Sequence, residues 1–419
     1  MNVRMKLPSL DGTIIAPSSK SFTQRYVLYS AFSNKKITLN NISFCNDEIV
    51  SIDIAKKCNA TVKYNKKNIT IEPNFICPND IYFGESGTSY RLGIGLISGR
   101  KCNVETYGEA SLARRPIDDL LKCYSKLNIK FSQNDKKFYN INASHALNNY
   151  CVIDGKISSQ YVSSLLFYYS FFDRGKFSVT NPVSENYIDI TIKCLDDFGI
   201  SVYRQNDGYI VENLGKPKKI IDIEGDYSSI SYFIVLAIFK GDITIRNLNK
   251  NSLQPDSSIV HIINDACNAI EIFGDYIKIH KVGELKSITI DVASVPDLAP
   301  IIATLGIFST NGVRILNYQR LSKKESDRFL NILDLVKKFG AVTEVSDNSI
   351  LIKKGQIKKP EFIEYDDHRM VMSAIVAGLI AESDTLYGNI EAINKSYPEF
   401  LNDLKKVGAE VTFIPSLSK

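Results

Sequence analysis

The stretch SKSFTQRYVLYSAF, residues 19–32, places a polar cluster directly before an apolar run. A helix that is apolar on every side belongs inside a protein rather than on its surface. The polar residues fall mainly in the first turn, where backbone N–H groups lack helical partners and the helix dipole favours negative charge. The stretch therefore predicts a buried helix whose N-terminus can contribute to an anion site.

The same pattern recurs five more times along the chain, each time as a polar opening followed by an apolar run. The other openings are GTSYR (87–91), SSQY (158–161), DYSSISY (226–232), VPD (295–297) and DDHR (366–369). If several of these helix N-termini converge, together they form an anion-binding site. The repetition thus predicts a mechanism as well as six buried helices.

A second marker, a turn residue between an amphipathic segment and a short strand-like segment, also occurs six times. Asn and Gly tolerate the left-handed conformation that commonly follows a helix. The expected turn residues are Asn59, Asn128, Gly199, Gly274, Gly340 and Gly408, at intervals of 69, 71, 75, 66 and 68 residues. Because this period exceeds that of ordinary solenoid repeats, each α/β unit is interpreted as a small subdomain.

Six units divide most simply into three and three, which predicts two lobes with a cleft between them. The chain has 419 residues, enough for two or three domains with full cores. Turn-rich sequence near Pro17–Ser19 and near Glu224–Asp226 marks the expected crossings between the lobes. We therefore expect an N-terminal lobe at 19–225 and a C-terminal lobe at 1–18 plus 226–419.

Composition and charge are typical of a soluble enzyme. The net charge is only +5, and no nucleic-acid-binding motif occurs. The N-terminus lacks the apolar core of a signal peptide, and the apolar runs are too short and too interrupted to cross a bilayer. Eight Cys without a close CxxC pair, and only four His, make a zinc site or a disulfide framework unexpected. The expected location is a reducing cytoplasm.

The chemistry is expected at the helix starts, where charged residues stand in unfavourable places. Lys20 and Arg25 flank the positive end of the first buried helix, which is unfavourable unless an anion binds there. Asp297 stands between apolar neighbours, where desolvation can turn a carboxylate into a base. The charge run KKESDR (323–328), taken alone, is more typical of a solvated surface. A metal site at DDHR is not expected, because no His or Cys follows at ligand spacing.

Ten motifs along the chain resemble those of one family, the 5-enolpyruvylshikimate-3-phosphate (EPSP) synthases, or 3-phosphoshikimate 1-carboxyvinyltransferases. They are SSKSFTQR, GESGTSYR, RRPI, SSQY, VSENYIDIT, EGDYSS, VPDLAPIIAT, KKESDR, DDHRMVM and KSYPEF. Each motif alone is weak, but ten in the correct order over the whole chain are specific. The resemblance implies a two-lobed inside-out α/β barrel. Each lobe would hold three βαβαββ units around buried parallel helices, with helix N-termini pointing towards the interlobe cleft.

The resemblance also implies roles for individual residues. Asp297 and Glu325, with Lys20, match the catalytic acid–base groups. The implied contacts to shikimate 3-phosphate are Lys20, Ser21, Arg25, Ser158, Ser159, Gln160, Ser184, Tyr187, Asp297 and Lys324. The implied contacts to phosphoenolpyruvate are Lys20, Gly87, Arg115, Gln160, Lys324, Arg328, Arg369 and Lys395.

The implied reaction transfers the enolpyruvyl group of phosphoenolpyruvate to the 5-hydroxyl of shikimate 3-phosphate and releases phosphate, in the shikimate pathway to chorismate and aromatic amino acids. Glyphosate, a phosphonate mimic, is implied to share the phosphoenolpyruvate space at Gly87. We expect these small molecules as partners, with no metal, organic cofactor, nucleic acid or membrane, and a monomeric chain. Departures from the family pattern occur at Glu85–Ser86 and Leu92. One extra residue in NYQRLSKKES leaves open whether Asn317 or Gln319 contacts substrate.

Three alternatives stay open at this point. The sister enolpyruvyl transferase that acts on UDP-N-acetylglucosamine typically has Asn after its Lys and a reactive Cys in a loop. Here Ser21 follows Lys20, and GEASLARRP (108–116) has no Cys. A non-catalytic anion-binding homologue is disfavoured by the intact charged positions. A nucleic-acid-processing relative would need a catalytic His, and His368 belongs to the DDHR motif instead.

Overall fold

The structure, a computed structural model, describes residues 2–182, 185–282, 284–323 and 326–415. The chain forms two compact units. We call Ser18–Ile223 the inserted unit, and Met1–Pro17 together with Glu224–Lys419 the flanking unit. The chain passes between them after Pro17 and after Ile223, one and two residues before the boundaries that the turn residues predict.

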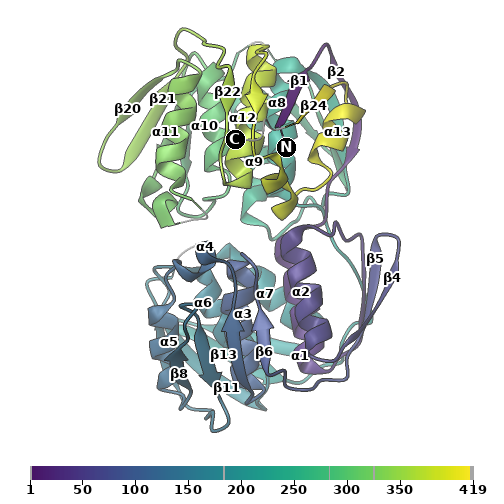
Figure 1. Cartoon of the computed structure of the whole chain (residues 1–419), viewed down its shortest axis with the longest axis vertical. Coiled ribbons are helices and arrows are strands. Elements are labelled where there is room, and N and C mark those ends of the chain that lie inside the picture. The colour runs from purple at the N-terminus through teal and green to yellow at the C-terminus, as the bar shows by residue number, and fades with distance from the viewer. Residues whose placement is uncertain (1, 183–184, 283, 324–325, 416–419) are drawn as a thin grey trace. The chain divides into compact units, whose positions relative to one another are not determined.

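Six four-stranded sheets carry the fold, three in each unit, so the α/β fold class is confirmed (Figure 1). In every sheet two parallel strands lie side by side, and two further antiparallel strands follow next to the second. In the inserted unit the sheets are β14 (Ile220–Asp222), β3 (Ile37–Asn40), β5 (Asn68–Glu72) and β4 (Thr61–Asn65); β6 (Asp80–Tyr82), β7 (Asn103–Tyr107), β9 (Tyr139–Asn142) and β8 (Lys130–Gln133); and β10 (Cys151–Asp154), β11 (Arg174–Thr180), β13 (Gly208–Asn213) and β12 (Ile200–Gln205).

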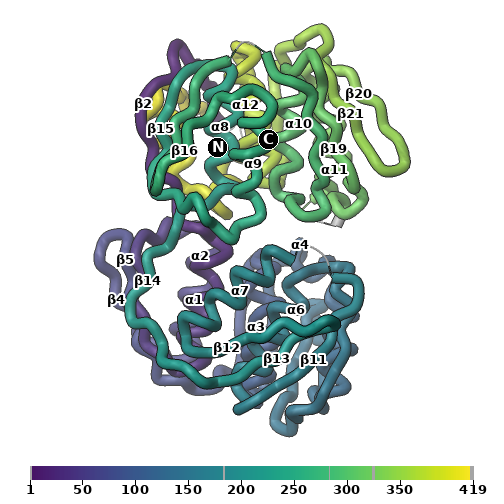
Figure 2. Tube along the Cα trace, turned by 180° about the vertical axis from the view of Figure 1, so that it is seen from behind, coloured from purple at the N-terminus to yellow at the C-terminus, as the bar shows by residue number. Residues whose placement is uncertain are grey.

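The flanking unit repeats this arrangement. Its sheets are β22 (Phe362–Ile363), β23 (Leu386–Tyr387), β1 (Asn2–Lys6) and β24 (Glu410–Ile414); β2 (Leu10–Ile15), β15 (Gly241–Arg246), β17 (Tyr276–Ile279) and β16 (Ile270–Ile272); and β18 (Ile288–Asp291), β19 (Val313–Leu316), β21 (Ser349–Lys353) and β20 (Val342–Val345). Three strands pair with partners that lie far from them in the sequence. β14 pairs with β3, β2 pairs with β15, and β1 lies between β23 and β24 (Figure 2 shows β2 beside β15).

All six predicted buried helices form. They are α1 (Lys20–Ser33), α3 (Gly87–Gly99), α6 (Ser159–Tyr169), α8 (Tyr227–Lys240), α10 (Ala299–Phe308) and α12 (His368–Ala381). The polar openings cap four of them through side chains that accept a helix N–H, namely Ser86, Ser158, Asp226 and Asp367. The VPD opening differs, because Asp297 lies in a turn just before α10 rather than in its first turn. Pro300 explains the start, since proline suits the first turn of a helix.

The buried helices pack against one another within each unit. α1 and α6 pack on α3 in the inserted unit, and α8 and α10 pack on α12 in the flanking unit (Figure 1). The α3–α6 contact depends on Gly95, where a Cβ would lie 2.1 Å from the carbonyl oxygen of Ser164. Only glycine permits this backbone approach. These apolar helices supply many of the buried residues of each core.

Along the chain, each sheet also has one amphipathic helix that connects two of its strands. These helices are α2 (Asn46–Lys57), α5 (Asp118–Ser125), α7 (Asn186–Asp197), α9 (Ser258–Cys267), α11 (Arg328–Lys338) and α13 (Phe400–Lys406), beside the short α4 (Ala110–Ala113) and the 3-10 helices η1 (Pro255–Ser257), η2 (Tyr318–Lys323) and η3 (Ile390–Lys395). Five of the six predicted turn residues have positive φ angles. The prediction for Gly274 is wrong, because this residue lies between β16 and β17.

The fourth turn residue is Asn268, with a φ of 52° after α9. With Asn268 in place of Gly274, the turns recur at intervals of 69, 71, 69, 72 and 68 residues, more evenly than the sequence alone indicates. The segment CNAIEI (267–272) is therefore the counterpart of CNATVK (58–63). The neighbouring Phe-Gly pair, which imitates the Phe-Gly of other units, caused the error.

The cysteines differ from the prediction at one place. Cys77 and Cys102 form a disulfide, with Cα atoms 5.6 Å apart, although no disulfide framework is expected from their spacing. The two residues precede the parallel strands β6 and β7, and this strand pairing brings them together. In the described part of the chain, no helix is long and apolar enough to cross a membrane. Nor do the described residues include a group of three or more His, Cys, Asp or Glu that could hold a metal ion.

Candidate active site

Lys20 and Ser21 open α1 in the inserted unit. The Lys20 ammonium lies 2.8 Å from the Asp47 carboxylate at the start of α2. Both side chains are largely buried, with 16% and 8% exposed. A cation at a helix N-terminus is disfavoured by the dipole, and Asp47 compensates for this. Asp47 was not identified from the sequence, because 27 residues separate it from Lys20 and no local pattern links them.

Arg25 follows one turn later on α1 and is 1% exposed. Its Nε donates to the Thr191 hydroxyl on α7 at 2.7 Å. Its Nη1 donates to the Ser21 carbonyl at 2.8 Å, and its Nη2 to the Tyr187 carbonyl at 3.4 Å. Burial lowers the pKa of Arg25 to about 10, so the side chain stays cationic at neutral pH. The structure therefore brings together Ser21, Arg25 and Tyr187, three of the residues predicted to contact shikimate 3-phosphate.

Gly87 opens α3, and two guanidinium groups lie against it. A Cβ on Gly87 would lie 2.7 Å from Nη1 of Arg115 and 3.6 Å from Nη1 of Arg91. Arg91 donates to the Gln160 side-chain oxygen at 2.7 Å, and the Gln160 amide donates to the Thr88 hydroxyl at 2.8 Å. Three predicted phosphoenolpyruvate contacts, Gly87, Arg115 and Gln160, thus form one cluster, which also holds Arg91.

Arg91 is a cation that sequence reasoning missed. A signal for it exists, since residues four apart lie on one face of a helix and Arg91 stands four residues after Gly87 in an otherwise apolar segment. The two serines at the start of α6 have simpler roles. The Ser158 hydroxyl accepts the Gln160 N–H at 3.2 Å and so caps the helix, and Ser159 is buried beside it. Ser184 lies outside the described residues, so its contact stays a prediction.

In the flanking unit, Asp297 lies between two arginines. Its Oδ1 accepts from Nη1 of Arg328 on α11, and its Oδ2 from Nη2 of Arg369 on α12, both at 2.7 Å. The fully buried Arg328 also donates from Nε to Asp367 at 2.7 Å. Asp367 in turn accepts the backbone N–H of Arg369 at 2.9 Å as the cap of α12. The four side chains form one continuous charged network.

This network gives Asp297 charged neighbours that its apolar sequence neighbours do not indicate. Its side chain is 24% exposed and lies against two guanidinium groups, and its role as a base stays a prediction. Burial alone lowers the pKa of Arg369, but the surrounding negative charges, first that of Asp297, outweigh burial and raise it well above its ordinary value.

The remaining predicted residues of the flanking unit are only partly placed. Lys395 ends η3, which packs on α12, and it is 8% exposed. Lys324 and Glu325 lie outside the described residues, so their roles stay predictions. The Asn317 amide donates to Asp291 at 2.8 Å, and the Gln319 amide donates to the backbone of the β20–β21 turn at 2.5 Å. Both contacts tie this segment to the same sheet, and neither singles out Asn317 or Gln319 as the substrate contact.

A further carboxyl group near this network was missed from the sequence. Asp256 in η1 is 1% exposed and accepts a hydrogen bond from the Ser228 hydroxyl in the first turn of α8. Burial, and secondly the charge of Asp297, raise the pKa of Asp256 to about 7. The sequence around it, LQPDSS, reads as an ordinary turn and gives no sign of a buried acid.

The raised pKa of Asp256 predicts a pH-dependent effect on stability. An aspartate in an unfolded chain has a pKa of about 3.9. The stability from Asp256 is therefore fully present below about pH 4 and is lost as the pH rises through about 7. Since Asp256→Asn imitates the protonated form, we expect it to be more stable than the unsubstituted chain at pH 8, by up to about 4 kcal/mol, and nearly equal at pH 4.

Urea denaturation followed by circular dichroism at pH 4, 6 and 8 measures this difference. Asp265→Asn, at an exposed position on the neighbouring helix α9, is the matched control and should show a pH dependence close to that of the unsubstituted chain. A difference between Asp256→Asn and the unsubstituted chain that stays constant from pH 4 to pH 8 would contradict the assignment.

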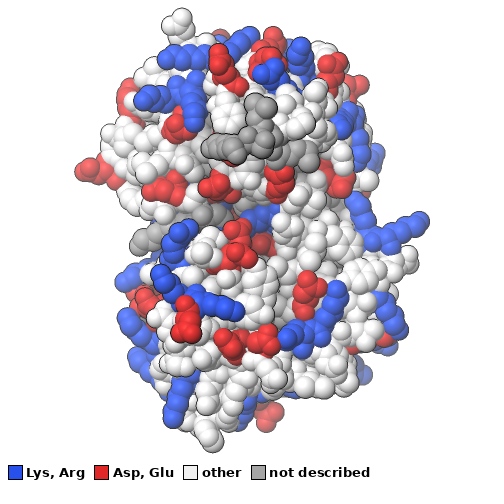
Figure 3. Space-filling view, in the orientation of Figure 1, with Lys and Arg blue, Asp and Glu red and all other residues white. Residues whose placement is uncertain are grey.

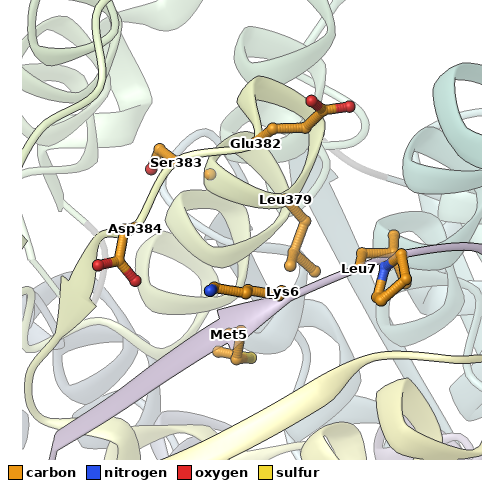
Figure 4. Close-up of a pocket in the computed structure, with 9 residues that line it drawn as sticks. Met5, Lys6, Leu7, Leu379, Glu382, Ser383 and Asp384 are labelled. Atoms are coloured by element: carbon orange, nitrogen blue, oxygen red, sulfur yellow. The ribbon is translucent and has the colours of Figure 1, made fainter.

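Figure 3 shows Lys and Arg interleaved with Asp and Glu over the face that it displays. A cavity of about 360 Å³ lies in the flanking unit where β1 ends beside the C-terminal end of α12 (Figure 4). Its rim carries Glu382 and Asp384 against one cation, Lys6. It lies at the opposite end of α12 from Arg369, and none of the four residues of the charged network lines it.

Comparison with known proteins decides the family. The family model described as EPSP synthase (3-phosphoshikimate 1-carboxyvinyltransferase) matches residues 6–404. The chain belongs to the EPSP synthase family. A curated 3-phosphoshikimate 1-carboxyvinyltransferase of Picrophilus torridus is 50% identical over 410 residues, 97% of this chain and 99% of that relative. Another, of Thermoplasma volcanium, is 41% identical over 406 residues, 96% of this chain and 98% of that relative.

Solved structures agree with the EPSP synthase assignment at the level of the fold. An EPSP synthase of Acinetobacter baumannii has a TM-score of 0.81 at 22% identity and covers 99% of this chain and 100% of its own. The enolpyruvyl transferase NikO of Streptomyces tendae has a TM-score of 0.77 at 14% identity, with 98% of each chain covered. The family resemblance inferred from the ten motifs is confirmed, and it favours the EPSP synthase reading over the UDP-N-acetylglucosamine enzyme.

Proposed function

We propose that this protein transfers the enolpyruvyl group of phosphoenolpyruvate to the 5-hydroxyl of shikimate 3-phosphate and releases phosphate. The observation that carries the proposal is the Asp297 carboxylate held between Arg328 and Arg369, in a chain of the EPSP synthase family. The pair of arginines suits a multiply charged anion, and the carboxylate suits a hydroxyl that must lose its proton.

Shikimate 3-phosphate would bind mainly through the inserted unit. Arg25 is fixed beside Ser21 and Tyr187, and Lys20 lies at the same helix end. Helix N-termini and cations together favour a phosphate group. We include Ser158, Ser159, Gln160 and Ser184 from this unit, and Asp297 and Lys324 from the flanking unit, as the family resemblance implies.

Phosphoenolpyruvate would contact residues of both units, most of them cations. The inserted unit would supply Lys20, Gly87, Arg115 and Gln160, to which we add Arg91 because it is hydrogen-bonded to Gln160 beside Gly87. The flanking unit would supply Lys324, Arg328, Arg369 and Lys395. Each phosphoenolpyruvate carries several negative charges, so a clamp of this composition offsets the cost of removing it from water.

The chemistry would proceed in three steps. Phosphoenolpyruvate first takes over Arg328 and Arg369, so that Asp297 leaves the guanidinium groups and can accept the proton of the 5-hydroxyl. Glu325, with Lys20, delivers a proton to the methylene carbon, and the hydroxyl oxygen attacks C2. The tetrahedral adduct then loses phosphate and a methyl proton to give the enolpyruvyl ether. Each acid–base step contributes roughly 10²–10⁴-fold.

This scheme requires the two units to act together. We propose that they are the lobes of the inside-out α/β barrel that the family resemblance implies, with the active site in a cleft between 19–225 and the rest of the chain. Closure would expel water and strengthen every charge interaction inside. The buried helices with polar N-terminal residues in each unit support this arrangement. We further propose a cytoplasmic monomer that needs neither metal nor organic cofactor.

Phosphate release in the presence of both substrates tests the function. The purified chain is incubated with shikimate 3-phosphate and phosphoenolpyruvate, phosphate is measured continuously, and the enolpyruvyl ether is identified by NMR. We expect release only with both substrates present, and none when UDP-N-acetylglucosamine replaces shikimate 3-phosphate. Release with the nucleotide sugar would favour the sister enzyme. Binding of both substrates without product would favour the non-catalytic homologue.

Gly87→Ala gives a prediction specific to phosphoenolpyruvate. The new Cβ would lie 2.7 Å from Nη1 of Arg115, so the guanidinium must move. Because this nitrogen is the end of a flexible side chain, its shift costs the protein itself little, but the methyl group narrows the space beside Gly87. The longer glyphosate fills that space more completely than the substrate, so it should lose more affinity. We expect glyphosate inhibition to weaken roughly ten- to a hundredfold. The KM for phosphoenolpyruvate should rise only roughly two- to fivefold, with the affinity for shikimate 3-phosphate nearly unchanged.

Inhibition and substrate kinetics on one preparation supply all three constants. Gly274→Ala is the matched control, because a Cβ there meets no atom within 4 Å, and it should leave them unchanged. Equal sensitivity to glyphosate before and after the Gly87 substitution would place this glycine outside the site.

A further inference from the structure

Two buried thiols of the inserted unit lie in contact although one comes from a helix and the other from a strand. Cys123 lies on α5 and Cys151 on β10, and their Sγ atoms are 3.1 Å apart. They are 3% and 2% exposed. The Tyr169 hydroxyl on α6 donates to Cys151 Sγ at 3.5 Å. Neither cysteine belongs to the proposed substrate contacts, so their pairing needs a separate explanation.

A disulfide needs an S–S distance of about 2.05 Å. The two sulfur atoms, 3.1 Å apart, therefore have to approach by only about 1 Å to reach bonding distance. The other described free cysteines are Cys45, Cys58, Cys194 and Cys267. No contact between any two of these sulfur atoms occurs among the described residues, so geometry singles out the Cys123–Cys151 pair.

We infer that Cys123 and Cys151 are a modification site at which a peroxide forms a second disulfide bond beside Cys77–Cys102. The Cys151 thiol loses its proton and its sulfur attacks one peroxide oxygen. The O–O bond breaks, the sulfenic acid forms, and the leaving hydroxide takes up that proton and departs as water. The Cys123 sulfur then attacks the Cys151 sulfur, the S–O bond breaks, and a second water leaves. In sum, two thiols and one hydrogen peroxide give one disulfide and two waters, so the thiols are oxidised and the peroxide is reduced.

The hydrogen bonds assign the order of attack. Cys151 Sγ accepts bonds from the Cys123 S–H and from the Tyr169 O–H. The bond from Cys123 is the main cause that lowers the pKa of the Cys151 thiol, and the same bond, followed by burial, raises that of Cys123. Since the thiolate is the nucleophile, Cys151 reacts first and Cys123 resolves. Hydrogen peroxide is small, and local opening of the eight-residue helix α5 gives it access.

The new bond would stabilise the inserted unit near the phosphoenolpyruvate residues. It closes a chain segment of 28 residues between α5 and β10. α5 follows directly after Arg115 and Pro116, and the Pro116 carbonyl accepts hydrogen bonds from Arg91 and Tyr161. Because the two sulfur atoms already lie in contact, we expect the cross-link to retain this geometry. Thermal stability should then rise while substrate affinity stays the same.

The test treats the full chain with a few equivalents of hydrogen peroxide at 37 °C and again a few degrees below its unfolding midpoint. Remaining thiols are then alkylated in denaturant, and disulfides are mapped by mass spectrometry. We expect a Cys123–Cys151 cross-linked peptide beside Cys77–Cys102. The midpoint should rise by roughly 5–10 °C, as estimated for a loop of this size.

Two variants sharpen the result. In Cys123→Ser the resolving thiol is missing, so the Cys151 sulfenic acid should accumulate and react with dimedone. Cys58→Ala removes a buried cysteine that contacts no described sulfur atom and should leave the cross-link unchanged. The inference is overturned if Cys123 and Cys151 remain thiols at both temperatures while the half-buried Cys267 is oxidised. It is also overturned if dimedone labels Cys123 rather than Cys151 in the unsubstituted chain.

Discussion

Asp297→Asn should lower kcat by roughly 10²-fold or more and at the same time tighten the binding of phosphoenolpyruvate. The first effect follows from the loss of the proton acceptor for the 5-hydroxyl. The second follows from the geometry of the ligand-free network, where the Asp297 carboxylate occupies Arg328 and Arg369 at 2.7 Å each. A neutral amide competes less well with an anion, so the Kd of phosphoenolpyruvate should fall by roughly tenfold, or about 1.4 kcal/mol.

Steady-state kinetics and calorimetric titration with phosphoenolpyruvate measure the two effects separately. The affinity for shikimate 3-phosphate should stay within a few-fold. Asp265→Asn, at an exposed carboxylate on α9 of the same unit, is the matched control and should change neither quantity. Near-normal turnover of Asp297→Asn would remove Asp297 from the mechanism. An unchanged Kd would mean that phosphoenolpyruvate does not replace its carboxylate on the arginines.

Arg328→Met should destabilise the flanking unit by about 3–5 kcal/mol, the usual effect of leaving a buried charge without its partner. Arg328 is fully buried, and its Nε is bonded to Asp367, which is fully buried as well. Methionine preserves much of the side-chain volume but removes the charge. The double variant Arg328→Met/Asp367→Asn removes both charges and should recover a large part of the loss.

Urea denaturation of the single and double variants gives the coupling between the two charges. Lys338→Met on the same helix removes a partly exposed cation paired with Asp334 and should cost less than about 1 kcal/mol. Equal losses for Arg328→Met and Lys338→Met would show that the buried pair contributes no more to stability than a surface pair.

The helical half of the fold is predictable from the sequence because its signals are local. Ser86, Ser158 and Asp367 each cap a helix that begins at the next residue, as the polar openings predict. Sheet pairing is harder to predict from the sequence, because a short strand contains too few residues to specify which other strand it pairs with. Nothing in the sequence of β14 indicates that it pairs with β3, more than 180 residues earlier.

The candidate site shows the same difference between local signals and long-range contacts. Charged residues at helix starts, such as Lys20 and Arg369, are visible as charges in electrostatically special places. Their partners Asp47 and Asp297 come from other segments, and only the fold reveals those ion pairs. Gly274 shows the opposite failure, since a local Phe-Gly pattern imitated a helix end that Asn268 supplies. Local patterns therefore identify the elements, and tertiary contacts decide what each side chain does.

The strand pairing also determines when each sheet can be completed while the chain is synthesised on the ribosome. The inserted unit is continuous, and β14 completes its first sheet at Asp222, so its last strand emerges while the chain is about half made. β1 and β2 leave the ribosome first but wait longest, since Leu10 pairs with Gly241 and Asn2 with Ile414. Domains tend to fold as they emerge. β1 and β2 therefore stay unpaired until after the whole inserted unit has been synthesised. Unpaired strands can associate with other chains, so a chaperone would be of most use at these two strands.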